Sequence, residues 1–193
     1  IPQLVRIINM NERSSFPDRP RDETERSFLE GRDYNMKKLV KTNVMRLLDA
    51  AKIAYEAKEY PVDENDLSGS HAADLMGVDH GSVFKTLVLR GEKTGYMVCC
   101  IPVDGEVDLK KAARAAGDKK VEMLPMKELL PVTGYVRGGC SPIGMKKRFP
   151  TYLDKSAGEY EKIAVSAGMR GVQVILSPAD LGRYVGAEMA DLM

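Results

Sequence analysis

Hydrophobic and polar positions alternate in short blocks along most of this chain, and the blocks predict small helices and strands in mixed order. Apolar residues at helical spacing run from Val44 to Ala51, which is typical of a helix with one buried face. Asn43 precedes this stretch and is a candidate N-cap residue. Further helices are expected over residues 70–76, from Asp108 to Gly117, over 127–130, and after Ser177 at the C-terminal end.

Short apolar runs that are bounded by glycine, proline or charged residues predict the strands. They cover residues 55–60, 83–89, 96–103, 120–123, 163–166 and 172–176, with two more near Tyr135 and Tyr152. A short loop, 91–95, separates the second run from the third and indicates a hairpin. Many short strands without a regular βαβ alternation predict an α+β fold, in which helices surround a mixed, partly barrel-like sheet.

The N-terminal part of the chain differs from the rest. Residues 1–35 are rich in charge and proline and poor in periodic apolar positions. Such a segment buries too little surface to offset its ordering entropy. We therefore expect a poorly ordered tail or an extension over residues 1–35 and one folded domain over residues 36–193. Met36, followed by Lys37 and Lys38, resembles a natural start.

Composition and charge narrow the class of protein. The 193 residues are 44% hydrophobic and 30% charged, with a net charge of +1, so the whole molecule has no field that would attract a polyanion. No apolar run reaches the roughly 18 residues that span a bilayer, and no signal-peptide pattern occurs. The odd number of cysteines argues against a disulfide framework. We expect a cytoplasmic protein without a membrane partner.

Most familiar catalytic motifs are missing from the sequence. His71 and His80 do not stand at a motif-like distance from a serine or cysteine. The sequence contains no CxxC or HExxH metal motif, no P-loop and no GxGxxG fingerprint. A metal site, a phosphoryl-transfer enzyme and a dinucleotide oxidoreductase are therefore not favoured, and no cofactor is expected.

One lysine and two glycine-rich segments are the remaining candidates for a functional site. Lys85 stands inside the apolar run VFKTLVLR, where an unpaired ammonium is costly to bury. Residues 133–144 contain four glycines, and residues 166–171 contain two more. Glycine lets a ligand approach backbone N–H groups closely. Together they suggest a pocket for a carbonyl oxygen or a ribose. Alternatively, the segments are ordinary turns, and Lys85 extends into solvent at a strand edge.

Five segments together resemble the YbaK/EbsC family, and the resemblance runs from about Met36 to the C-terminus. They are VFKTLV (83–88), LKKA (109–112), KKVEM (119–123), TGYVRGGCSPIG (133–144) and VSAGMRG (165–171). This family contains aminoacyl-tRNA deacylases that are related to the editing domain of bacterial prolyl-tRNA synthetases. The resemblance implies a mixed barrel-like sheet with surrounding helices. It also implies hydrolysis of the ester in misacylated tRNA, most characteristically Cys-tRNA(Pro), without a cofactor.

The resemblance also implies the site residues. Lys85 matches the lysine that is most closely tied to activity in the family. The residues expected to form the substrate pocket are Phe84, Thr86, Gly138, Gly139, Ser141, Pro142, Ser166, Gly168, Arg170 and Gly171. The nucleophile stays open between the substrate's own thiol, a water molecule and Cys140. Family members usually carry an aliphatic residue at the position of Cys140, which could instead be a small hydrophobic residue in the loop.

The partner expected from the resemblance is misacylated tRNA. Lys146, Lys147 and Arg148 directly follow the glycine-rich segment and are expected to contact tRNA phosphates, although a solvated charged face is the simpler interpretation of such a run. Prolyl-tRNA synthetase is a possible second partner that would present the tRNA. Two other functions stay open: a deacylase for another amino acid, such as alanine on tRNA(Pro), and a non-catalytic regulatory module that binds tRNA or a nucleotide.

Overall fold

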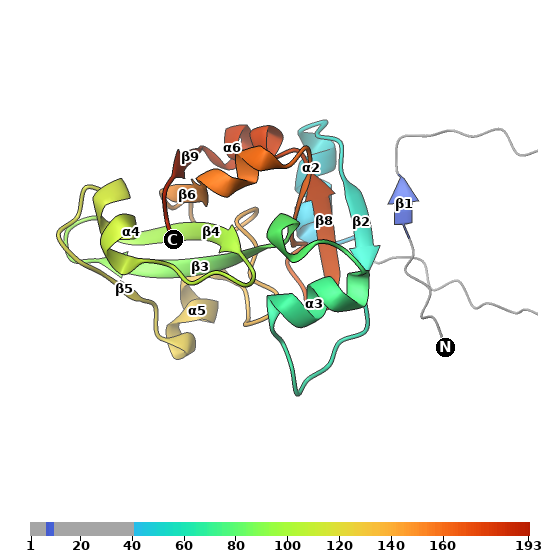
Figure 1. The fold of residues 1–193 in the computed structure, drawn as a ribbon, viewed down its shortest axis with the longest axis horizontal. Helices are drawn as coiled ribbons and strands as arrows, with labels where there is room; N and C mark the ends of the chain where they lie inside the picture. The colour runs from blue at the N-terminus through green and yellow to red at the C-terminus, as the bar shows by residue number, and fades with distance from the viewer. Residues whose placement is uncertain (1–6, 10–40) are drawn as a thin grey trace, which may run out of the picture.

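The computed structural model describes residues 7–9 and 41–193, and it shows an α+β fold (Figure 1). The helices are α2 (Asn43–Ala50), α3 (Gly69–Met76), α4 (Leu109–Ala115), α5 (Met126–Thr133) and α6 (Pro178–Val185). The strands are β1 (Ile7–Asn9), β2 (Glu56–Glu59), β3 (Phe84–Gly91), β4 (Gly95–Pro102), β5 (Val121–Met123), β6 (Thr151–Asp154), β7 (Ile163–Ser166), β8 (Val172–Leu176) and β9 (Ala187–Ala190). Two short 3₁₀ helices are η1 (His80–Ser82) and η2 (Lys155–Glu159).

The strands form two sheets that meet at one point. The first has the order β1-β2-β8-β7 and is antiparallel. The second has the order β5-β3-β4-β6-β9 and is mixed, because β6 is parallel to both β4 and β9. A single parallel bridge between Val83 and Ala164 joins the sheets, and the strands of one run across those of the other (Figure 1). The predicted α+β class with a mixed sheet is confirmed.

Side-chain caps explain where several helices begin and end. Asp108 accepts hydrogen bonds from the backbone N–H groups at the start of α4, and Ser177 caps α6 ahead of Pro178, as the sequence predicts. The left-handed Gly77, with φ of 63°, ends α3, because glycine adopts this conformation without a steric penalty. The cap predicted for α2 was wrong. Thr42 is the extended residue whose Oγ1 accepts from Met45 N at 3.2 Å, and Asn43 is already helical.

One predicted strand does not form. The segment around Tyr135 is a loop that follows α5, because that helix extends to Thr133 and ends at the left-handed Gly134. Tyr135 ties this loop together: its backbone N–H donates to Thr133 Oγ1 at 3.0 Å, and its hydroxyl donates to Ile143 O at 2.6 Å. An aromatic residue that is typical of strands therefore serves as an anchor for a loop.

The N-terminal prediction falls mostly outside the described residues. Within residues 1–35, only β1 is described, and it pairs with β2 in antiparallel register. The proposed tail and the domain boundary at residue 36 stay predictions.

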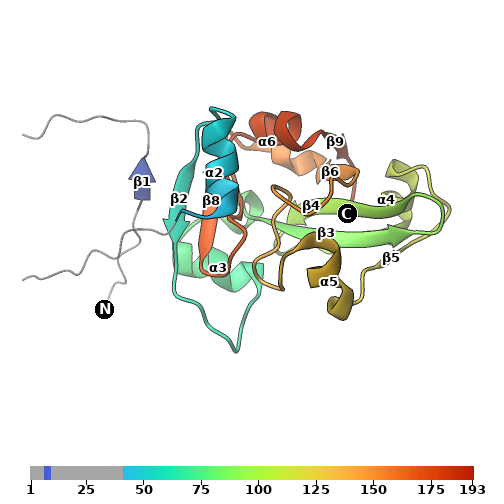
Figure 2. The ribbon, with the colours of Figure 1, turned by 180° about the vertical axis from the view of Figure 1, so that it is seen from behind.

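The main hydrophobic core contains buried residues of both sheets together with residues of α2 and α6. Figure 2 shows α2 in front of β2 and β8. On this helix Val44 and Leu48 are buried and belong to the same cluster as Val165 and Val174 of the sheet. A second cluster, including Leu89 and Ala112, lies between α4 and the β3–β4 hairpin. Among the helices that the structure describes, none is both long and apolar enough to cross a bilayer.

Candidate functional site

The candidate site lies along one edge of β3, between the residues that pair with β5 and the bridge to β7 at Val83. One edge of β3 is paired with β4 along its whole length. Its other edge pairs with β5 over residues 89–91, and Val83, directly before β3, forms a bridge with Ala164 of β7. Between these contacts, residues 84–87 have no strand partner on this edge within the described part of the chain. A cavity of about 420 Å³ opens at this gap, and residues 83–88 line it.

Lys85 lines this cavity. Its Nζ donates a hydrogen bond to the backbone oxygen of Val103 at 2.8 Å, which holds the ammonium against the wall. Burial lowers the pKa of Lys85, and the nearby carboxylates of Glu106 and Asp104 act in the opposite direction. The side chain therefore occupies a cavity beside the open edge of β3, in accordance with the pocket hypothesis. Its catalytic role stays a prediction.

The backbone of Thr86 also faces the gap. Polar backbone groups in an antiparallel pair alternate between the two sides of a strand. Val83 O accepts from Val103 N of the hairpin, whereas Val88 O accepts from Leu124 N on the opposite side. Thr86 is two residues before Val88, so its N–H and C=O point to the same side as those of Val88, which is the open edge. A substrate in the cavity can therefore meet a side-chain cation and free backbone groups on the same strand.

Polar residues from several other segments also line the cavity, among them Tyr60 and Ser68. The loop after α5 contributes Arg137, Gly138 and Cys140, β7 contributes Ser166, and β8 contributes Gln173. The described residues that line the cavity include no aspartate or glutamate, whereas Lys85 and Arg137 carry positive charge. Apolar residues complete the wall: Leu67, Ala72, Phe84, Leu87, Val103, Met123, Leu124, Met126 and Leu129. Such a site is suited to an electron-rich group on a small, partly apolar ligand.

Five of the predicted site residues meet at this cavity, and six lie elsewhere. Those that line it are Phe84, Lys85, Thr86, Gly138 and Ser166. The residues absent from its lining are Gly139, Ser141, Pro142, Gly168, Arg170 and Gly171. Sequence reasoning did not identify Tyr60, Arg137 or Gln173. Tyr60 and Gln173 lie outside the recognised segments, whereas Arg137 lies inside the first glycine-rich segment, directly before Gly138.

The first glycine-rich segment packs closely against the second. A Cβ atom on Gly139 would lie 3.2 Å from the backbone of Met169, so only glycine allows this approach. Ser141 is fully buried, and its Oγ accepts from Ile143 N at 3.3 Å. Gly168 has φ of 88° and lies close to Val44. These residues shape the loops that bring Gly138 and Ser166 to the cavity.

The side chain of Arg170, in the second glycine-rich segment, bonds to the first segment and to Glu64. Its Nε donates to Arg137 O at 3.0 Å, and its NH1 pairs with Glu64 at 2.7 Å. Gly171, at φ of 78°, would place a Cβ 2.7 Å from Val62 Cγ2. Both residues line a small hollow next to Gly138. Here they hold the loops together without lining the cavity.

Cys140 lines the cavity but is a poor candidate for the nucleophile. Burial raises the pKa of its thiol to about 12, and a cysteine attacks as the thiolate. At neutral pH the thiol is therefore protonated, which favours the interpretation of Cys140 as a small apolar residue.

Replacing Cys140 with valine should leave deacylation within about threefold of the parent, because the protonated thiol supplies little more than packing volume. The measurement is the single-turnover rate on misacylated tRNA. Cys99→Val, at a fully buried cysteine that does not line the cavity, is the matched control for loss of a thiol. A hundredfold loss that is confined to Cys140→Val would restore this thiol to the mechanism.

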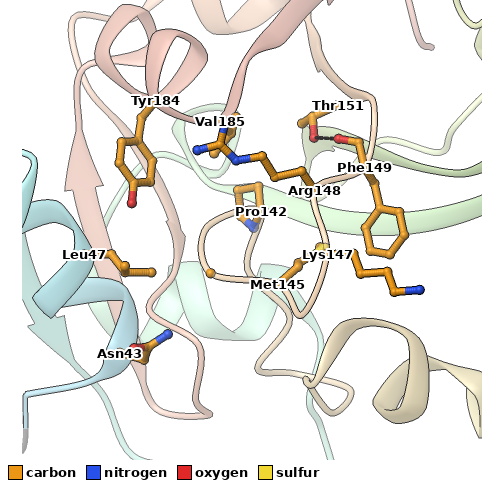
Figure 3. A pocket seen from close by; sticks show the side chains of 11 residues that line it. Asn43, Leu47, Pro142, Met145, Lys147, Arg148, Phe149, Thr151, Tyr184 and Val185 are labelled. Carbon is orange, nitrogen blue, oxygen red and sulfur yellow. Dashed lines mark hydrogen bonds between the residues drawn. The ribbon is translucent and has the colours of Figure 1, made fainter.

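The three basic residues after the first glycine-rich segment are divided between two locations. Lys146 Nζ donates to Leu130 O and Pro131 O, at 3.3 and 3.4 Å, near the C-terminal end of α5. Lys147 and Arg148 are exposed and line a second cavity of about 320 Å³. Figure 3 shows Arg148 extending toward Tyr184 and Val185 of α6, with Leu47 and Asn43 of α2 on another side of the cavity.

Comparison with known proteins places the chain in a family. Residues 66–184 match the family model described as an aminoacyl-tRNA editing domain, and this range contains both glycine-rich segments and every described lining residue of the cavity except Tyr60. The chain belongs to this family. It is 49% identical over 152 residues to the Enterococcus faecalis protein named "Putative Cys-tRNA(Pro)/Cys-tRNA(Cys) deacylase EbsC", covering 79% of this chain and 93% of that protein.

Two further comparisons show more distant similarity, one in sequence and one in structure. An uncharacterized Bacillus subtilis protein, YwhH, is 29% identical over 130 residues, covering 66% of this chain and 82% of that protein. A solved structure titled "Crystal structure of a putative trans-editing enzyme for prolyl tRNA synthetase" aligns with a TM-score of 0.68 at 27% identity. That alignment covers 77% of this chain and 93% of the other. The resemblance to the YbaK/EbsC family is confirmed.

Proposed function

We propose that this editing-domain protein hydrolyses the ester bond of misacylated tRNA, with Cys-tRNA(Pro) as its principal substrate. The observation that carries the proposal is the position of Lys85 in a small cavity whose described lining residues include no carboxylate, next to the open backbone edge at Thr86. The name of the Enterococcus faecalis relative supports the choice of cysteine and tRNA(Pro).

In the proposed reaction the aminoacyl group enters the cavity with its carbonyl oxygen directed to Lys85. A nucleophile attacks the carbonyl carbon, and negative charge develops on the carbonyl oxygen. The Lys85 ammonium and the Thr86 N–H are donors that would stabilise this oxyanion. The bond between the carbonyl carbon and the ribose oxygen then breaks, the ribose oxygen takes up a proton, and one water molecule is consumed overall. The products are free tRNA and the amino acid.

The nucleophile in this proposal comes from outside the protein. The partly buried, protonated thiol of Cys140 is unsuited to the attack. A water molecule or the substrate's own thiol, held close to the ester, gains its rate from proximity. An attack by the substrate thiol would form a cyclic thioester that water then opens, so the overall balance is the same.

The tRNA body is proposed to contact Lys147 and Arg148. Replacing both with alanine should weaken tRNA binding and reduce the slope of log affinity against log salt by about 1.4 to 1.8, the value for two lost phosphate contacts. Because neither residue lines the Lys85 cavity, the rate at saturating tRNA should change little. The measurement is tRNA affinity across a salt series.

The control for this pair is Lys119→Ala/Lys120→Ala, which removes the same charge from two exposed residues outside both cavities. An equal loss of slope in the control would show that only net charge matters. A salt-independent affinity in the parent protein would contradict phosphate contacts altogether.

The test of the proposed function is a panel of labelled misacylated tRNAs incubated with the pure protein. Release of cysteine from Cys-tRNA(Pro), faster than release of alanine from Ala-tRNA(Pro), is the expected result. Preferential release of alanine would redirect the assignment to another amino acid. If no substrate loses its label and the protein still binds tRNA, the non-catalytic regulatory module is favoured. Addition of prolyl-tRNA synthetase should raise the rate at low tRNA concentration if that enzyme presents the substrate.

A further inference from the structure

An unpartnered amide in the wall of the cavity points to a further part of the substrate site. Gln173 lies on β8, is 94% buried, and lines the cavity. Its Oε1 is the one buried side-chain oxygen or nitrogen without a hydrogen-bond partner within residues 41–193. Buried polar groups are almost always hydrogen-bonded in folded proteins, so an orphaned acceptor beside a candidate site requires an explanation.

Strand register places Gln173 beside the other polar residues of the cavity. In the β7–β8 pair, Gln173 is directly opposite Ser166, so both side chains lie on one face of the sheet. Ser166 and Lys85 each lie two residues beyond the parallel bridge that joins Ala164 to Val83. Lys85, Ser166 and Gln173 all line the same cavity. Ser166 Oγ already accepts from Gly168 N at 3.2 Å, whereas Gln173 Oε1 remains unused.

We propose that Gln173 Oε1 accepts a hydrogen bond from the α-amino group of the aminoacyl substrate. This inference rests on the proposed function. An aminoacyl ester that enters the cavity brings a carbonyl oxygen, which suits Lys85, and an α-amino group, which needs an acceptor. The described lining residues include two cations and no carboxylate, and Gln173 Oε1 is a buried acceptor among them without a partner, which suits it to an amine. Since this oxygen is already desolvated, it bonds the amine without losing water of its own.

The proposal has a consequence for stability as well as for binding. A buried acceptor without a partner destabilises the free protein. Replacing Gln173 with leucine, which has a similar shape and no polar atoms, should therefore leave the melting temperature unchanged or raise it. A residue with a purely structural role would show a lower melting temperature.

The experiment compares two substrates that differ only in the amine: cysteinyl-tRNA and 3-mercaptopropionyl-tRNA, which retains the ester and the thiol. The parent protein should prefer the cysteinyl substrate by about 10- to 100-fold in kcat/KM, the range expected for one charge-assisted hydrogen bond. Gln173→Leu should lower kcat/KM for the cysteinyl substrate by that factor. It should leave kcat/KM for the deamino substrate within about threefold of the parent value. Gln173→Glu keeps an acceptor and should keep the preference. Ser166→Ala, at the neighbouring position, should leave the ratio between the two substrates unchanged.

A binding measurement separates this inference from the proposed function. The probes are cysteinyl-adenosine with an amide in place of the ester, and the same molecule without its α-amine. If these bind with an amine preference that Gln173→Leu abolishes, while no tRNA is hydrolysed, the amine contact stands and the deacylase proposal fails. If Gln173→Leu lowers kcat/KM for both substrates and the affinity for both probes equally, or changes none of these values, the α-amine contact is wrong.

Discussion

Lys85→Ala should lower the rate of Cys-tRNA(Pro) hydrolysis by about 100- to 1000-fold, the usual effect of removing one preorganised oxyanion donor. The lysine lines the cavity, and its Nζ is fixed by the bond to Val103 O at 2.8 Å. Because the donor is already held in place, little reorganisation accompanies the developing charge. Alanine removes the ammonium without inserting a bulkier group, so the fold should be retained.

The appropriate measurement is the single-turnover rate at saturating enzyme, together with tRNA affinity and the melting temperature. A loss in rate with little change in affinity would place the interaction in the transition state. Lys93→Ala is the matched control, because Lys93 is exposed in the β3–β4 turn and does not line the cavity. Activity of Lys85→Ala within a few-fold of the parent would overturn the assignment. Equal losses in both variants would point to charge steering of the tRNA.

Gly168→Ala should destabilise the protein by about 2 to 4 kcal/mol, from left-handed backbone strain and overpacking combined. Gly168 has φ of 88°, and an added Cβ would lie 3.0 Å from both Val44 Cγ2 and Tyr135 Cε1. Val44 is fully buried in α2, and Tyr135 is tied to Ile143 O, so neither neighbour can move away without disturbing other contacts.

Chemical denaturation of the two glycine variants checks this value. Gly158→Ala is the control, since Gly158 is exposed, lacks a positive φ, and its nearest contact would be Met189 Cε at 3.9 Å. It should change the free energy of unfolding by no more than about 0.5 kcal/mol. Gly168→Ala should also reduce deacylation, because the shifted loop carries Ser166 with it through the Gly168 N–Ser166 Oγ bond. A Gly168→Ala variant as stable as its control would show that the loop relaxes freely.

The two glycine-rich segments illustrate how a motif can be recognised for one reason and required for another. The sequence suggested that their glycines and hydroxyls would surround a ligand. In the structure, Gly138 and Ser166 line the cavity, whereas Gly139 and Gly168 are required because side chains would collide with a neighbouring loop or helix. The motif therefore encodes the packing that forms the wall as well as the wall itself.

Local spacing and capping in the sequence determined most of the helices and strands. Apolar periodicity identified the helix at 44–51, a serine followed by proline identified α6, and two β-rich runs around a glycine loop identified the hairpin. These signals depend on residues a few positions apart, which the sequence shows directly. The conspicuous lysine in an apolar run was visible for the same reason, because Lys85 contradicts the pattern of its own strand.

The tertiary structure alone decided which residues share the cavity. Its opening depends on β3 leaving β5 and meeting β7, and Gln173 reaches it because β8 pairs with β7 in one particular register. Tyr135 has a strand-like neighbourhood, yet its hydroxyl bonds to Ile143 O and makes it part of a loop. Such contacts join residues that are far apart in sequence or depend on the packing around them. Local propensity carries no information about them, since they are set by the combined packing and register of the whole fold.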